Sequence, residues 1–130
     1  MGTPTPHKVI IAGSRHIEND AYSREQIKDL ILSYENRFGE TITHVITGKC
    51  SGVDTIGAEV AEGLDLEVIE YPADWSAHGY AAGPIRNRQM AANADGLILV
   101  WDGKSRGSHH MLNEARKAGL NITTHTDTGR

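Results

Sequence analysis

The chain has 130 residues, of which 38% are hydrophobic and 23% charged, and it carries a formal net charge of −4 at pH 7. This length suits one compact domain, and the acidic balance argues against a protein that coats nucleic acid through a basic face. The single cysteine excludes an intrachain disulfide framework, and neither a signal core nor an apolar run near ~20 residues is present, so we expect a cytoplasmic protein with no membrane contact.

Hydrophobic periodicity predicts strands that alternate with helices. The β-branched run at residues 8–12 indicates a first strand. Apolar residues at helical spacing then predict an amphipathic helix that Asn19 or Asp20 caps and that Gly39 ends. The apolar face of this helix consists of Ile27, Leu30, Ile31, Tyr34 and Phe38.

The same alternation continues to the end of the chain. The expected order is a strand at 44–47, a helix at 53–64, a strand at 67–71, a loop at 73–83, a helix from Pro84, a strand at 96–101, a helix from Ser108 to about Gly119 and a short strand at 121–124. Such alternation implies right-handed crossovers and a parallel sheet covered on both faces. We therefore predict an α/β protein with a Rossmann-like three-layer α/β/α fold and a parallel sheet of about five strands. It forms one domain at residues 8–125, between a disordered N-terminal tail at 1–7 and a C-terminal tail at 126–130.

Three glycine-bearing loops follow predicted strands, at residues 13–15, 48–52 and 103–108. Because the carboxyl ends of parallel strands meet at one edge of a sheet, these loops should converge on one crevice. The last loop precedes a helix whose N-terminus carries a partial positive charge, and Lys104 and Arg106 add full charges. The crevice is therefore expected to hold an anion.

Arginine and serine side chains supply the polar contacts that such an anion needs. Arg86 and Arg106 could clamp a phosphate or carboxylate, as could Arg15, because a guanidinium matches both geometries. The alternative is a solvated arginine, or an ion pair with Asp74 or Glu114. Hydroxyls that could donate to phosphate oxygens are Ser14, Ser105 and Ser108. Ser108 could equally cap the following helix, and one role does not exclude the other.

Two aspartates are candidates for catalysis. Asp54 begins a helix and could act as a general base or bind a ribose hydroxyl, or it could simply be favoured there by the helix dipole. Asp102 ends the central strand and could stabilise the positive charge that develops when a glycosidic bond breaks. Asp74 lies in a comparable position on a loop.

Aromatic and metal-binding side chains give weaker signals. Trp75 and Tyr80 could stack on a base or pin the long loop to the sheet, whereas Trp101 is expected in the core. Adjacent helical residues diverge by about 100°, so the pair at 109–110 does not suit one metal, although one of the two histidines could line the pocket. We expect no metal and no cofactor, and we expect Cys50 to be a packing or loop residue.

Five segments resemble motifs of the SLOG superfamily, which is named after the DNA-processing Smf/DprA proteins and the Lonely Guy enzymes. They are residues 13–15, 48–54, 71–75, 82–88 and 103–108. The resemblance covers residues 8–125 and is nearest to a small, often phage-encoded branch related to YspA and YpsA. It implies a nucleotide-binding domain, and a homodimer whose second subunit could complete the pocket.

The chain departs from the Lonely Guy enzymes in the loop that ends in their catalytic glutamate, Gly-Gly-x-Gly-Thr-x-x-Glu. Met111 takes the glutamate position, and Lys104-Ser105 replaces the paired glycines. Glu114 lies three residues further, about 60° away around the helix. Arg86 stands where those enzymes keep an arginine. The departure disfavours glycosidase chemistry and leaves binding intact.

The function expected is therefore that of a ligand sensor or sequestering protein that binds a nucleotide or nucleotide derivative. The alternative is an N-glycosidase that releases the base from a nucleoside 5′-monophosphate, with Asp54 and Asp102 as catalytic residues. Binding of single-stranded DNA is a third hypothesis that the acidic charge and short length oppose. The predicted ligand-binding residues are Gly13, Ser14, Arg15, Gly48, Ser51, Gly52, Asp74, Trp75, Arg86, Asn87, Ser105, Arg106, Gly107 and Ser108.

Overall fold

The structure, a computed structural model, describes residues 5–127. Its elements in chain order are β1 (Lys8–Gly13), α1 (Ala21–Phe38), β2 (His44–Thr47), α2 (Val53–Gly63), β3 (Glu67–Glu70), α3 (Trp75–His78), the 3₁₀ turn η1 (Gly79–Ala81), α4 (Ala82–Ala92), β4 (Gly96–Trp101), α5 (Arg106–Lys117) and β5 (Asn121–Thr126). The five strands form one parallel sheet in the order β3-β2-β1-β4-β5. The predicted fold class, a three-layer α/β fold with a parallel sheet, is confirmed.

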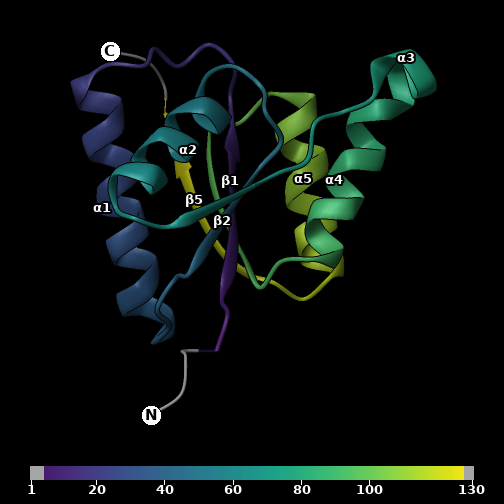
Figure 1. Cartoon of the computed structure of the whole chain (residues 1–130). Helices are drawn as coiled ribbons and strands as arrows, with labels where there is room; N and C mark the ends of the chain where they lie inside the picture. Colours follow the sequence, from purple (N-terminus) through teal and green to yellow (C-terminus); the bar gives the residue numbers. More distant parts are fainter. Residues whose placement is uncertain (1–4, 128–130) are drawn as a thin grey trace.

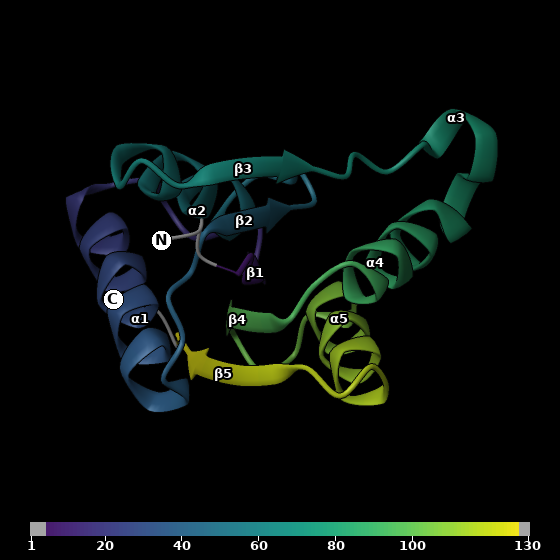
Figure 2. The same ribbon diagram turned by 60° about the horizontal axis from the view of Figure 1, so that its bottom comes forward.

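Two helices cover each face of this sheet (Figures 1 and 2). Helices α1 and α2 pack on one face, where the core includes Val9, Ile11 and Tyr34. Helices α4 and α5 pack on the other face, over Ile10 and Leu99. Because both faces are buried, the central strands carry apolar residues at consecutive positions rather than at alternate ones.

The central strand pair, β1 and β4, has almost no exposed surface. Their register runs from Val9 opposite Gly96 to Gly13 opposite Val100. Every residue of β4 except Trp101 is buried. This pair therefore fixes the position of the loops that leave its carboxyl ends, which are the loops that the candidate site requires.

Helix ends explain where the loops turn. Asp20 caps α1, because its side chain accepts a hydrogen bond from the Ser23 N–H, and Gly39 ends the helix at a φ of 65°. At α5 the cap is Ser105 and not Ser108. The Ser105 hydroxyl accepts from the Ser108 N–H, so the prediction that Ser108 caps this helix is wrong and Ser108 lies in its first turn.

The segment expected to be a loop at 73–83 contains a short helix and a 3₁₀ turn. Asp74 begins α3 by accepting a hydrogen bond from the Ala77 N–H, and α4 begins at Ala82, two residues before the predicted Pro84. No residue from 72 to 81 is buried, and the arm they form projects from the body of the molecule (Figure 2). A segment without a buried face carries no hydrophobic period, so the sequence pattern missed it.

The predicted tails are partly ordered. Residues 1–4 and 128–130 of these tails lie outside the described part of the chain, but His7 is buried and its Nε2 lies 2.8 Å from the Tyr34 hydroxyl. The last strand continues to Thr126, which pairs with Trp101, so it is longer than predicted and takes in the first residue of the expected C-terminal tail. Within residues 5–127 no helix has both the length and the apolar character needed to cross a membrane.

Candidate functional site

A crevice of about 580 Å³ opens at the carboxyl edge of the sheet, between α4 and α5 and beside the loops that follow β1, β2 and β4. The residues on its walls that the sequence had singled out are Gly13, Ser14, Arg15, Asp54, Trp75, Arg86, Asn87, Asp102, Ser105, Arg106, Gly107 and Ser108. The structure thus brings together residues from all three glycine-bearing loops, as expected from a parallel sheet.

Four residues of the predicted ligand set do not line the crevice. Asp74 caps α3, and Ser51 is exposed. The Gly48 carbonyl accepts a hydrogen bond from Arg86. Gly52 has a φ of 75°, and a Cβ there would lie 2.3 Å from the Ser14 carbonyl oxygen, so it allows two loops to pack closely. Gly48 and Gly52 therefore contact residues that line the crevice, Arg86 and Ser14, without lining it themselves.

Arg86 is the most buried cation of the crevice, with 7% of its surface exposed. Its Nε donates to the Asn87 Oδ1 over 3.0 Å, its Nη1 donates to the Gly48 carbonyl, and both Nη atoms lie 3.7–3.8 Å from the Cys50 Sγ. Among the described residues no carboxylate lies within 4.0 Å of its nitrogens, so neither of the expected ion pairs, with Asp74 or with Glu114, forms. A buried guanidinium whose hydrogen-bond partners are all neutral, with Asp54 as the nearby acidic group, favours an anionic ligand.

Asp54 is 5% exposed and lies on the same wall. Burial raises its pKa from 3.8 to about 6, although the Cys50 N–H and the nearby charge of Arg86 act in the opposite direction. A carboxyl group with a pKa near neutrality can give up or take up a proton at physiological pH. Asp54 is thus the candidate catalytic residue whose environment suits proton transfer.

Asp54→Asn is expected to remove a pH dependence of the free energy of unfolding. Because the folded-state pKa of Asp54 lies above its ordinary value, its stabilising contribution is complete below pH 3.8 and is lost as the pH rises through about 6. The wild type should lose roughly 2 kcal/mol relative to the variant between pH 4 and pH 8. Urea unfolding at several pH values measures this, and a difference that stays constant with pH would contradict the raised pKa.

Asp102 holds the loop before α5. Its exposed carboxylate accepts hydrogen bonds from the N–H groups of Lys104 and Ser105, both over 2.8 Å, and these bonds lower its pKa. Its own N–H donates to the Ser14 hydroxyl over 3.1 Å. A carboxylate with a lowered pKa stays ionised, so Asp102 holds this loop and keeps the negative charge that stabilising a positive charge in the crevice would need. Its catalytic role stays a prediction.

The N-terminus of α5 gives this wall groups that suit an anion. The first N–H groups of a helix have no intrahelical acceptor, and those of Arg106 and Gly107 lie in this first turn. The side chains of Ser105 and Ser108 lie beside them, and Arg106 adds a full charge. A phosphate could therefore bind between this helix start and Arg86 on the other wall.

Several crevice residues were not in the predicted set. They are Ala12, His16, Cys50, Gly83, Pro84, Met90, His110 and Met111. His16 could have been found because it continues the Gly13-Ser14-Arg15 loop. Met90 and Met111 follow the helical period of core residues, and nothing in the sequence separates a methionine facing a crevice from one facing the core. His110 was one of two candidates, and its neighbour His109 instead stacks on the half-buried Trp101, which was expected in the core.

The aromatic residues of the arm differ in position. Trp75 lines the mouth of the crevice and is 51% exposed. Tyr80 is fully exposed and does not line the crevice, so in this structure it neither reaches a stacking position nor pins the arm. Across residues 5–127 there is no group of three or more His, Cys, Asp or Glu side chains arranged to hold a metal ion.

The chain is similar to a curated protein and to a solved structure. No protein-family model matches the chain. The gene 61 protein of Mycobacterium phage D29 is 30% identical over 126 residues, which span 92% of this chain and 97% of that protein. The X-ray structure of DNA processing protein A (DprA) from Streptococcus pneumoniae is similar with a TM-score of 0.66 at 19% identity.

The DprA match covers 92% of this chain and 50% of the DprA chain, so this chain spans about half the length of that protein. It shows that the two proteins share the Rossmann-like α/β fold that the motifs predicted. Membership of the SLOG superfamily, and of its smaller branch related to YspA and YpsA, stays a prediction.

Proposed function

The chain belongs to the family of the gene 61 protein of Mycobacterium phage D29, and we propose that it binds a nucleotide or nucleotide derivative in the crevice between α4 and α5. The observation that carries this proposal is Arg86, which is buried in the crevice wall and, among residues 5–127, has no carboxylate within 4.0 Å of its nitrogens. Burying a guanidinium costs free energy that a bound anion would offset. The protein would then act as a sensor or as a sequestering module.

Two features of the crevice favour a nucleotide over a simple inorganic anion. The volume of about 580 Å³ is larger than a phosphate needs and suits a small organic ligand. The crevice is lined by polar groups at Ser105 and Arg106 and by apolar groups at Trp75 and Pro84, on which a base could lie. A phosphate at the start of α5 and a base near Trp75 would use both kinds of surface.

Thermal unfolding with a panel of nucleotides tests the proposal. The panel contains ribo- and deoxynucleoside mono-, di- and triphosphates, cyclic nucleotides, NAD and ADP-ribose. A ligand at about 100 times its dissociation constant adds roughly 2.7 kcal/mol, which should raise the midpoint of this chain by about ten degrees. A shift confined to one class of nucleotide is expected, and no shift with any compound would overturn the proposal.

Gly107→Ala sharpens the same experiment. A Cβ at Gly107 meets no atom within 4 Å, and alanine is a better helix former, so the free protein should unfold at a temperature equal to or above that of the wild type. The same methyl group enters the space in which a phosphate would approach the first turn of α5. The ligand-induced shift should therefore shrink in a variant that is at least as stable, and an unchanged shift would place the phosphate elsewhere.

The N-glycosidase is a second candidate, favoured by the raised pKa of Asp54 on the crevice wall. Met111 occupies the position of the catalytic glutamate of the Lonely Guy enzymes, so Asp54 would have to move the proton from the opposite wall. The nucleotide with the largest thermal shift is incubated with the protein, and free base is measured by chromatography. Release that Asp54→Asn abolishes while the thermal shift persists would support the enzyme, whereas no release leaves the binding function alone.

A further inference from the structure

A chain of polar contacts connects the surface of α5 to the buried Arg86. The Arg86 Nε donates to the Asn87 Oδ1 over 3.0 Å, and the Asn87 Nδ2 lies 3.1 Å from the His110 Nδ1. The His110 Nε2 lies 3.5 Å from the Glu114 Oε1. Arg86 and Asn87 belong to α4, and His110 and Glu114 belong to α5; the two helices lie side by side in Figure 2.

The direction of each hydrogen bond follows from Arg86. An arginine Nε only donates, so the atom of Asn87 that faces it is the amide oxygen. The amide nitrogen of Asn87, which only donates, therefore faces His110, and the His110 Nδ1 must accept. The proton of a neutral His110 then sits on Nε2, where it points to the Glu114 carboxylate.

We propose that His110 is a positioning residue whose proton state sets the orientation of Arg86 in the crevice. A neutral His110 accepts from Asn87, and Asn87 in turn holds the guanidinium of Arg86. A protonated His110 carries a donor on each ring nitrogen, so two donors meet at Asn87. The Asn87 amide must then turn over, and Arg86 loses the acceptor of its Nε. The consequence for the ligand rests on the proposed function, whereas the coupling itself does not.

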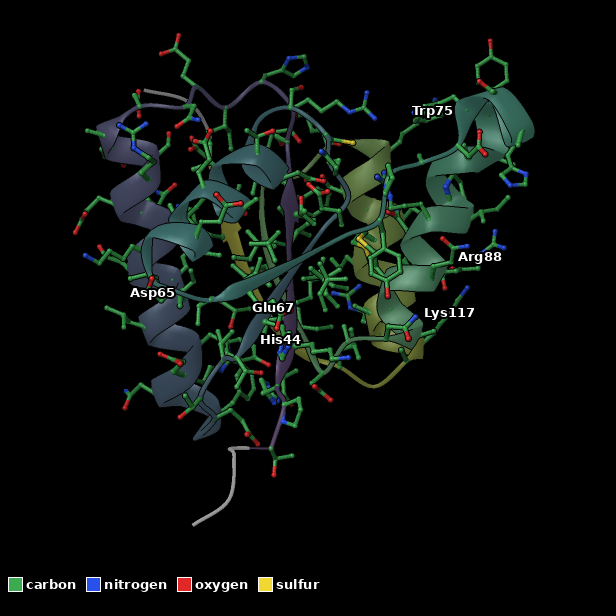
Figure 3. All side chains as sticks on the ribbon, in the orientation of Figure 1. His44, Asp65, Glu67, Trp75, Arg88 and Lys117 are labelled. Carbon is green, nitrogen blue, oxygen red and sulfur yellow. The ribbon has the colours of Figure 1, made fainter. Side chains whose placement is uncertain are left out.

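The charges around His110 favour the neutral form near pH 7. Burial lowers its pKa below 6.5, Glu114 acts in the opposite direction, and the cations Arg88 of α4 and Lys117 of α5 add to the lowering. Both cations project from the same side of the α4–α5 pair (Figure 3). On the crevice side the charged or titratable groups are Arg15, His16, Arg86, Asp102, Arg106 and Asp54. Burial raises the pKa of Asp54 to about 6, so its titration must be separated from that of His110. Acidification is therefore the direction that disturbs Arg86.

Nuclear magnetic resonance of the free wild-type protein tests the coupling without any ligand. At pH 7.5 a long-range ¹H–¹⁵N spectrum should show His110 protonated on Nε2. As the pH falls, the Arg86 Nε–H signal should shift with the midpoint of the His110 titration. An Nδ1-protonated His110, or an Arg86 signal that ignores this titration, would overturn the proposal.

His110→Asn separates this effect from the titration of Asp54. The asparagine oxygen takes the place of the accepting Nδ1 and does not titrate. The Arg86 Nε–H signal should therefore lose the pH-dependent shift that the wild type shows at the midpoint of the His110 titration. His109→Asn is the matched control, because His109 stacks on Trp101 and does not line the crevice. The control should retain the wild-type response, and a loss of the response in both variants would also overturn the proposal.

Affinity for adenosine 5′-monophosphate shows the effect on binding. Titration of Asp54 and of the phosphate is common to wild type and His110→Asn. The dissociation constant of the wild type divided by that of His110→Asn therefore isolates the effect of His110. This ratio should rise about fivefold between pH 7.5 and pH 5, the effect of one hydrogen bond, as the wild type loses its hold on Arg86. A falling ratio would mean that the added charge of His110 dominates and would overturn the positioning role. Absence of binding by both proteins at every pH tested would count against adenosine 5′-monophosphate as the ligand, while the Arg86 signal still decides the coupling.

Discussion

Gly13→Ala is expected to lower the free energy of unfolding by about 3 kcal/mol, because β1 and β4 cannot stay paired around an added methyl group. A Cβ at Gly13 would lie 1.7 Å from the Val100 carbonyl oxygen and 3.0 Å from a methyl carbon of Val53. The same carbonyl accepts the Ser14 N–H over 3.0 Å. The clash involves backbone in the centre of the sheet, so no side chain can rotate away to relieve it.

Chemical denaturation of the two proteins measures this loss, and Gly63→Ala is the matched control. Gly63 is the last residue of α2, and a Cβ there meets no atom within 4 Å. Its replacement should leave stability unchanged or raise it by about 0.5–1 kcal/mol, because alanine reduces the freedom of the unfolded chain. Equal effects of the two substitutions would show that the strands can separate at Gly13 without a large cost.

The sequence predicted the strands and long helices well because their signals are local. Residues 96–101 form an apolar run between two turn signals, and the face of α1 repeats at helical spacing from Ile27 to Phe38. These patterns reflect burial against neighbours on both sides of each element. Residues 73–83 gave no such signal, since their helix is held by the Asp74 cap and by no buried side chain.

Helix starts were harder to predict when two residues could cap. Ser105 and Ser108 both precede or begin α5, and either could accept from a backbone N–H. The choice depends on Asp102, whose carboxylate accepts from the N–H groups of Lys104 and Ser105 and so turns the chain before Ser105. This arrangement requires the end of β4 to be fixed first, and a local pattern contains no such information.

The candidate site was predictable at the level of loops and not at the level of partners. Glycines after strands placed three loops at one edge of the sheet, and the crevice lies there. The burial of Asp54 and the contact between Asn87 and His110 depend on how α4 packs against α5. Residues 23 positions apart give no sign in the sequence that they touch.

Arg86→Met is expected to weaken binding of the nucleotide selected by thermal unfolding by about 100-fold. Methionine keeps most of the apolar stem and removes the guanidinium, and a hydrogen bond to a charged group contributes about 1.5–3 kcal/mol. The variant also leaves the Gly48 carbonyl and the Asn87 oxygen without their arginine donor. Isothermal titration calorimetry gives the affinity, and the midpoint of unfolding without ligand shows whether the variant is folded.

Arg116→Met is the control that separates local contact from net charge. Arg116 is exposed in the last turn of α5 and does not line the crevice, so its loss changes the charge of the chain by the same amount. Its effect on affinity should be less than about twofold at 0.15 M salt, because exposed charges beyond a Debye length of ~8 Å are screened. If both variants weakened binding equally, long-range attraction would explain the affinity and Arg86 would not contact the ligand. A large effect confined to Arg86 assigns the anion to the wall of the crevice on which Arg86, Asn87 and Asp54 lie.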